Sequence, residues 1–289
     1  MSHRNSVRKY NKKRSSNTLK YCGYAACFVL IAVGVWITSR ASEAQSTPNE
    51  TEQVSNRDNN DLLSVTAPKG LKSVNLEYPG FTIEYNPKYK QPNWVAWELT
   101  REKANADKYS RNDADFFPDP NVPDGPTLAD YKGSGYDRGH MCPAGDMKWS
   151  LDGMRSCFYL TNMSPQSHEL NNGSWKSLEE KCREWANRDS SIIIVCGPVL
   201  SDKMTNSIGD NKIPVPERYF KVVLAPYANP IRAIGFIMPN GKVKGGMQAA
   251  AVSVDEVESI TGFDFFSSLP DDIENKIEAE CNFPRWSQR

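Results

Sequence analysis

Residues whose side chains could do chemistry together lie between positions 137 and 179. Asp137, Arg138 and His140 place an acid, a cation and an imidazole within four positions, and Asn171 and Glu179 follow with an amide and a carboxylate. A neutral imidazole can take a proton from water near pH 7, and an arginine can bind phosphate through parallel hydrogen bonds. Amide and carboxylate oxygens suit a hard divalent cation. The set therefore predicts metal-assisted hydrolysis of a phosphodiester.

Of the three histidines, His140 has the most distinctive surroundings. His3 lies in a basic N-terminal head. His168 lies in a polar loop, as a solvated side chain or a peripheral substrate contact. His140 follows Asp-Arg-Gly and precedes the turn Met141-Cys142-Pro143. Taken alone, a histidine is more often structural than catalytic, so the downstream residues decide the interpretation.

A helix is predicted to carry the downstream pair. Apolar residues recur with a 3–4–3 spacing between Trp175 and Arg188, which is typical of an amphipathic helix. Asn171 would lie near its start, as a cap, about 12 Å along the axis from Glu179. On one reading Asn171 is only a cap and Glu179 only a surface charge. On the other, Asn171 presents its oxygen to Mg²⁺ and Glu179 holds one of the ion's water molecules.

Three ordered blocks carry a resemblance to a known family. Residues 137–140 read DRGH, residues 161–166 read TNMSPQ, and residues 170–175 read LNNGSW and are followed by Leu178 and Glu179. In order and spacing these blocks resemble the DNA/RNA non-specific endonucleases, the family of the secreted Serratia nuclease and mitochondrial endonuclease G. The resemblance covers about residues 75 to 280. It implies a ββα-metal core and a Mg²⁺ cofactor, with Mn²⁺ as a substitute.

The resemblance also implies a role for each matching side chain. His140 resembles the general base, Asn171 the metal ligand, and Glu179 the carboxylate that orients a metal-bound water. Arg138 resembles the arginine that engages phosphate beside the base, and Arg111 resembles a second phosphate arginine in a loop that aligns poorly. The implied substrates are DNA and RNA, cleaved without sequence preference to leave 5′-phosphate ends. Some relatives form homodimers.

One position departs from the family pattern, and two residues beside the site are expected to have supporting roles. Asn172 stands where the family pattern has glutamine, which we expect to change packing beside the ligand. We expect Asp137 to pair locally and Asn162 to shape the site without binding metal. One alternative is a catalytically silent, nuclease-like binding domain, which the joint presence of base, ligand and arginine disfavours. The other is a phosphodiesterase for small nucleotides, which only substrate assays would separate.

The N-terminus predicts delivery across a membrane. Residues 1–20 hold seven Lys or Arg and no acid, and residues 21–38 form an uncharged, mostly apolar run. As a helix this run would be about 27 Å long, close to the thickness of a bilayer. The chain would be anchored with its body outside the cytoplasm, periplasmic or extracellular, or secreted if the run is a cleaved signal sequence. Residues 39–66 are polar and predict a disordered linker to a domain at 67–289.

The body predicts an α+β fold with a central, mainly antiparallel sheet. Strands are expected at residues 81–85, 94–99, 158–161, 192–196, 220–224 and 233–238, and short helices at 255–260 and 273–281. Strands outnumber helices and do not alternate with them regularly. A long polar loop is expected over residues 103–135, and loops of this length are usually functional.

Charge and cysteines limit the partners. Beyond residue 20, 28 basic side chains face 35 acidic ones, so binding of a polyanion needs a local basic groove. Five cysteines lie in the body, and at least one of them must be free. A disulfide such as Cys182–Cys281 can form if the protein is extracytoplasmic. Buried, unpaired cysteines fit the sequence equally well.

Overall fold

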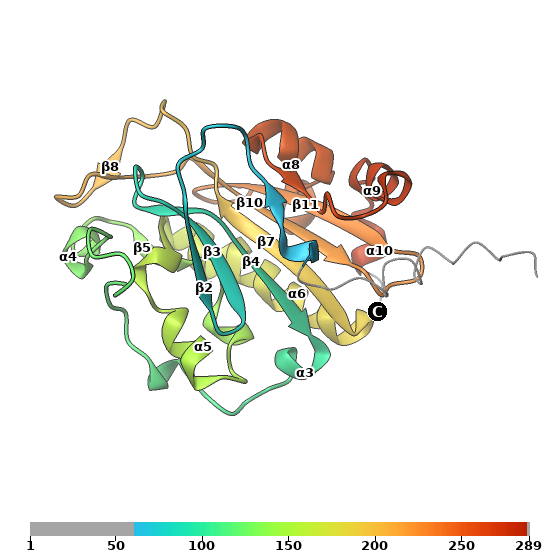
Figure 1. Cartoon of the computed structure of the whole chain (residues 1–289), viewed down its shortest axis with the longest axis horizontal. Helices are drawn as coiled ribbons and strands as arrows, with labels where there is room; N and C mark the ends of the chain where they lie inside the picture. The colour runs from blue at the N-terminus through green and yellow to red at the C-terminus, as the bar shows by residue number, and fades with distance from the viewer. Residues whose placement is uncertain (1–60, 288–289) are drawn as a thin grey trace, which may run out of the picture. The chain divides into compact units, whose positions relative to one another are not determined.

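A seven-stranded antiparallel sheet is the frame of the molecule (Figure 1). The computed structural model describes residues 61–287. The strand order is β12-β11-β10-β7-β4-β3-β2, and every neighbouring pair is antiparallel. The strands are β2 (Val74–Tyr78), β3 (Phe81–Asn86), β4 (Gln91–Thr100), β7 (Ser191–Pro198), β10 (Arg218–Ala225), β11 (Arg232–Pro239) and β12 (Ala251–Val252).

The central strand β7 is buried along its whole length, since helices cover both faces of the sheet. Ile192 and Ile194 pack into one apolar cluster, and Ile193 and Val195 pack into another. Successive side chains of a strand point to opposite faces. The continuous apolar run at 192–196 therefore serves two cores, which explains why it lacks alternation with polar residues.

Two helical layers supply the other halves of these cores. Helix α6 (Lys176–Asp189) contributes Leu178, Cys182 and Trp185 to the first cluster, which confirms the helix predicted from the 3–4–3 spacing. Helices α8 (Val254–Thr261) and α9 (Asp271–Glu278) contribute to the second cluster on the opposite face. The sheet thus separates α6 from α8 and α9.

Shorter elements complete the described residues. They are η1 (Asp61–Leu63), β1 (Val65–Thr66), α3 (Arg101–Ala104), η2 (Arg111–Asp113), α4 (Leu128–Tyr131), β5 (Asp137–His140), η3 (Ala144–Asp146), α5 (Leu151–Ser156), η4 (Leu160–Asn162), β6 (Met163–Gln166), η5 (Leu170–Trp175), β8 (Ser207–Ile208), β9 (Ile213–Pro214), α7 (Gly246–Ala250), β13 (Asp264–Phe265) and α10 (Phe283–Ser287). The loop expected over residues 103–135 is largely irregular and holds only η2, α4 and the end of α3.

Five of the six predicted strands are present, and each is longer than predicted. The strand predicted at residues 158–161 is wrong, because the chain there forms a turn and then η4. Phe158 and Leu160 are buried in the core without forming strand pairs, and one isolated bridge joins Tyr159 to Phe117. The last predicted helix ends at Glu278, before Cys281.

The N-terminal predictions fall mostly outside the described residues. The basic head, the apolar run at 21–38 and the linker up to residue 60 are not described. Within residues 61–287, no helix has the length and apolar character needed to cross a membrane. At the end of the predicted linker, Leu62 is fully buried and β1 pairs with β13.

Candidate active site

A two-stranded antiparallel ribbon and the helix after it hold the DRGH residues. Strand β5 pairs with β6, with His140 opposite Met163 and Gly139 opposite Ser164. A Cβ atom at Gly139 would lie 2.2 Å from Oε1 of Gln166, so only glycine lets the Gln166 side chain lie across β5. The order β5, β6, η5 and α6 is a ββα arrangement, as the resemblance implied.

His140 lies between two aromatic rings with one nitrogen free. Its ring centroid lies 5.3 Å from that of Phe116 and 4.8 Å from that of Phe158. The Nε2 atom is buried and has no hydrogen-bond partner. Burial lowers the pKa of His140 to about 3, and the charges of Arg111 and Arg138 add to this effect. The imidazole is therefore neutral at pH 7 and able to accept a proton.

The two predicted arginines lie over the same two rings. The guanidinium of Arg138 lies 4.3 Å from the ring of Phe116, and that of Arg111 lies 5.8 Å from the ring of Phe158. Arg111 begins the short helix η2, whose start is closed by a capping box between Ser110 and Asp113. Thus Arg111, from a loop that aligned poorly, comes beside His140.

Asn171 occupies a different place from the predicted cap. It lies in the π-helical segment η5, which runs directly into α6 but contains non-helical backbone at Gly173, and its side chain makes no capping hydrogen bond there. Instead its Nδ2 donates to Oδ2 of Asp137 at 2.9 Å. The cap interpretation is wrong, because the amide group of Asn171 donates to Asp137 and non-helical backbone at Gly173 lies between Asn171 and α6. The side-chain oxygen of Asn171 remains as the atom able to bind a cation.

Asp137 is the local partner that the sequence predicted. Its Oδ2 also accepts from Nδ1 of His168 at 2.9 Å, and His168 itself is exposed. A second link joins the ribbon to η5, since Nε1 of Trp175 donates to the backbone oxygen of His140 at 3.2 Å. Together these bonds set the position of η5 relative to β5.

Glu179 lies in the first turn of α6, above a buried cation. Burial raises the pKa of Glu179 to about 7, and the positive charge of Lys221 opposes that rise. Lys221 lies on β10 and is fully buried. Its Nζ is 4.4 Å from the ring centroid of Trp175 and 5.2 Å from that of Trp97. Such cation–π contacts partly replace the lost hydration of the lysine.

Arg183 is a site residue that the sequence reasoning missed. It follows Glu179 by four positions, a spacing that places both side chains on one face of α6. Its Nη1 lies 2.8 Å from Oδ1 of Asp146, a carboxylate that also accepts from Nε1 of Trp97 at 3.1 Å. A Cβ atom at Gly145 would lie 2.7 Å from Nη1 of Arg183. The spacing from Glu179 was the available signal.

One cavity of about 970 Å³ brings these residues together. All five predicted residues line it: Arg111, Arg138, His140, Asn171 and Glu179. Six basic side chains and two acidic ones lie along its wall, namely Arg111, Lys132, Arg138, Lys148, Lys176 and Arg183 against Asp137 and Glu179. A net-acidic body thus carries the local basic groove that polyanion binding requires.

Buried residues beneath the cavity brace it without entering it. Asn162 accepts from the backbone N–H of Cys142 and donates to the carbonyl oxygens of Cys142 and Cys157. These bonds hold the backbone at Cys142, two positions after His140. The five cysteines of the described residues are all free, four of them buried and Cys281 exposed. The reading of unpaired cysteines is the one that the structure bears out.

Comparison with known proteins decides the family. A model of the DNA/RNA non-specific endonucleases matches residues 58–272, about three quarters of the chain. This chain belongs to the DNA/RNA non-specific endonuclease family. The matched range includes the ribbon, η5 and α6.

Named relatives from distant organisms agree with that membership. The chain is 34% identical over 208 residues to the mitochondrial nuclease EXOG of Danio rerio, covering 66% of this chain and 60% of that protein. It is 33% identical to a nuclease of Nostoc sp. over 70% of this chain and 76% of that protein. It is 35% identical to nuclease C1 of Cunninghamella echinulata, over 67% of this chain and 83% of that protein. The match thus spans less than two thirds of the EXOG nuclease.

A solved structure supports the fold. The EndoG chain in a crystal structure of the EndoG/EndoGI complex, which describes EndoG inhibition, superposes with a TM-score of 0.64 at 27% identity. The match covers 69% of this chain and 88% of that chain. The antiparallel sheet with helices on both faces is therefore an arrangement that this endonuclease family shares.

Proposed function

We propose that this chain is a Mg²⁺-dependent endonuclease that hydrolyses phosphodiester bonds of DNA and RNA without sequence preference. The observation that carries the proposal is the neutral His140, whose buried Nε2 has no partner and which lines a basic cavity with Asn171 and Glu179. Family membership and nuclease-named relatives support the same reaction class.

His140 acts as the general base in this proposal. Its Nε2 takes a proton from the attacking water, and its low pKa keeps that nitrogen unprotonated in the resting enzyme. The imidazolium formed in the step would be unfavourable between two arginines in the free protein. A bound phosphate would bring negative charge close to all three groups and offset that repulsion.

The arginines bind and orient the phosphate. Arg138 lies over Phe116 and Arg111 over Phe158, the two rings that flank His140, and both arginines line the cavity. Arg183 adds a third guanidinium, and its pairing with the buried Asp146 holds it in place. Cations that are held before the substrate arrives stabilise developing charge without reorganisation during the reaction.

The residues present fit a Mg²⁺ or Mn²⁺ ion. The amide nitrogen of Asn171 donates its hydrogen bond to Asp137, so the amide oxygen is the atom available for the ion. Glu179 adds a carboxylate that also lines the cavity. Mg²⁺ needs few protein ligands because it keeps most of its waters. When bound, the ion would stabilise negative charge on the phosphate and on the leaving 3′ oxygen, leaving a 5′-phosphate.

The N-terminus supports a place outside the cytoplasm. The basic head and the apolar run of residues 21–38 favour a membrane anchor or a cleaved signal sequence, with the catalytic domain periplasmic, extracellular or secreted. A homodimer is part of the proposal only through the family resemblance.

The test is cleavage of supercoiled plasmid and of a structured RNA by the full chain, with Mg²⁺ and with EDTA. We expect metal-dependent cleavage of both substrates, and a loss of at least about 100-fold in His140→Ala. Circular dichroism would check that the variant folds. Cleavage of neither polymer by folded protein would favour the silent binding domain, and turnover of small nucleotides alone would favour the small phosphodiesterase.

A further inference from the structure

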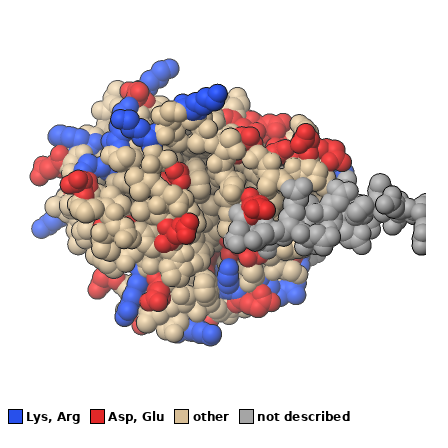
Figure 2. All heavy atoms as spheres, in the orientation of Figure 1, with Lys and Arg blue, Asp and Glu red and all other residues tan. Residues whose placement is uncertain are grey.

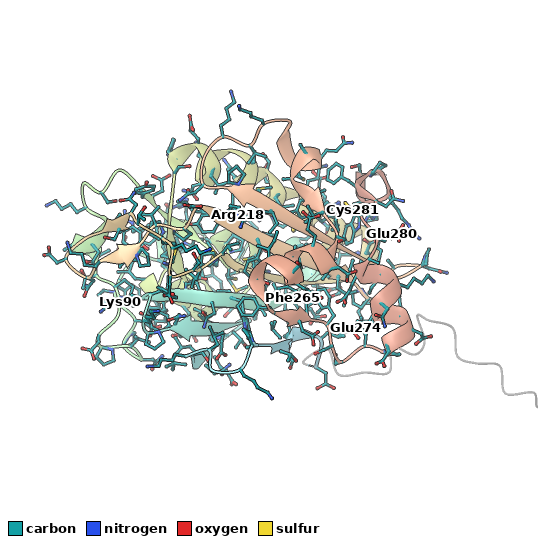
Figure 3. The ribbon with its side chains drawn as sticks, turned by 90° about the horizontal axis from the view of Figure 1, so that it is seen from above. Lys90, Arg218, Phe265, Glu274, Glu280 and Cys281 are labelled. Atoms are coloured by element: carbon teal, nitrogen blue, oxygen red, sulfur yellow. The ribbon has the colours of Figure 1, made fainter. Side chains whose placement is uncertain are left out.

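Three carboxylates meet between α8 and α9, on the face of the sheet opposite α6. Asp255 and Glu258 lie on α8, and Glu278 is the last residue of α9. One oxygen from each lies within 4.8 Å of the other two, a grouping found here alone among residues 61–287. Figure 2 shows acidic side chains gathered over these helices. Figure 3 looks onto the same layer from above, with Phe265 and Glu274 labelled.

Glu278 points into this group without a partner. The residue is 5% exposed, and its Oε1 is buried with no hydrogen bond. A buried carboxylate in that state is unfavourable unless it is neutral or compensated by a cation. Burial raises the pKa of Glu278 to about 9, with the charges of Glu258, Glu274, Asp255 and Asp264 adding to the rise.

The neighbouring groups are arranged around a common point. One oxygen of Glu258 accepts the backbone N–H of Phe265 at 2.8 Å, which orients the carboxylate and leaves its second oxygen available. Burial raises the pKa of Glu258 to about 7. Asp255 is exposed, so solvent and ions reach the group from its side. In this group Glu278 is buried, Glu258 is oriented by its hydrogen bond, and Asp255 is exposed to solvent.

We propose that Asp255, Glu258 and Glu278 form a second divalent-cation site, of the calcium type, that joins α8 to the end of α9. Ca²⁺ binds carboxylate oxygens at about 2.3–2.6 Å, so ligands on opposite sides of the ion are about 4.6–5.2 Å apart. The three carboxylate oxygens lie within 4.8 Å of one another, a separation that one Ca²⁺ ion can bridge. Ca²⁺ accepts irregular sets of carboxylate oxygens, whereas Mg²⁺ demands a near-regular octahedron and keeps several of its waters, so a cluster of three carboxylates suits Ca²⁺ better.

This site is independent of the active-site cavity. None of its three carboxylates lines the cavity, and α8 and α9 pack into the apolar cluster on the other side of the sheet from α6. Ion binding here would tie two short helices together and stabilise the layer that they form. The proposal does not rest on nuclease activity.

Calorimetry with Ca²⁺ alone, on the full chain, tests the site. The background is Asn171→Ala, which removes the proposed ligand in the cavity, so that the heat measured comes from elsewhere. We expect one Ca²⁺ per chain and a rise in the unfolding temperature of at least about 2 °C at saturating Ca²⁺. Absence of both in the folded protein would overturn the proposal.

Variants of the carboxylates assign the response to residues. Glu278→Gln keeps the size of the side chain and its neutral state, and Asp255→Asn changes an exposed position, so both should fold. We expect each variant to bind Ca²⁺ with an affinity at least about tenfold lower. Glu256→Gln removes the same charge from an exposed position of α8 outside the group and should keep the response. Full binding in both Glu278→Gln and Asp255→Asn would disprove the assignment.

Discussion

At the residue scale, the low pKa of His140 links the site to stability. The folded protein keeps His140 neutral down to about pH 3, whereas an unfolded chain protonates it near pH 6.5. Between these values the unfolded state binds more protons, so the free energy of unfolding falls as the pH falls. His140 is thus one source of acid sensitivity in the metal-free protein.

Denaturation by urea at two pH values would measure this effect. Between pH 6.5 and 5 we expect His140 to reduce the free energy of unfolding by on the order of 1–2 kcal/mol. His140→Gln should lack that part of the pH dependence, because glutamine does not titrate. An unchanged slope in the variant would show that His140 is not held neutral in the fold.

A second effect at the residue scale is the action of the buried Lys221 charge on Glu179. The lysine opposes the effect of burial on Glu179. In Lys221→Met the pKa of Glu179 should rise further, so the acid limb of the cleavage profile should move to higher pH. We expect a loss of about tenfold at pH 7 and a smaller loss at pH 9. Equal losses at both pH values would indicate a packing role instead.

At the scale of elements, Gly139 sets how closely the Gln166 side chain lies over β5. Gly139→Ala would force its Cβ against Gln166, which is fully buried. We expect a destabilisation of about 1–3 kcal/mol, measured by urea denaturation, together with slower cleavage because His140 follows on the same strand. Adding Gln166→Ala removes the obstructing group, so the double variant should recover part of the loss. Strict additivity would rule out this contact as the cause.

The sequence predicted the sheet strands and α6 well, because their apolar patterns are long and local. It failed at residues 158–161, where Phe158 and Leu160 have strand-forming composition but fill the core from a turn. It also placed Asn171 wrongly as a helix cap, since the hydrogen bond to Asp137 joins positions 34 apart. Lys221 stood in an apolar strand, and its partners, Trp97 and Trp175, come from two other elements. Such contacts depend on tertiary structure that local pattern does not contain.

At the scale of the whole molecule, a basic cavity lies in an otherwise net-acidic body. Binding of duplex DNA should therefore depend on a few local cations and weaken with salt. In EDTA, fluorescence anisotropy over about 50–200 mM KCl should give a straight log–log plot. Lys176→Ala, at the cavity wall, should reduce its slope by about 0.9, the value for one lost phosphate contact.

An exposed lysine elsewhere provides the matched control for that measurement. Lys203 is exposed and does not line the cavity, so Lys203→Ala should leave the slope unchanged. Equal changes in the two variants would mean that the protein attracts DNA through its general charge and not through the cavity.

The bond between Asp137 and Asn171 has a consequence for which amino acids this fold can accept. An aspartate at position 171 would replace the donated hydrogen with a second anion 2.9 Å from Oδ2 of Asp137. The position is thereby closed to the commonest hard-metal ligand and open to its neutral relative. An ion held through a neutral ligand keeps nearly its whole double charge for the polyanion that it meets. Asp137 thus limits which residues position 171 can accept. In the proposed site, it favours an ion that keeps most of its charge for the substrate.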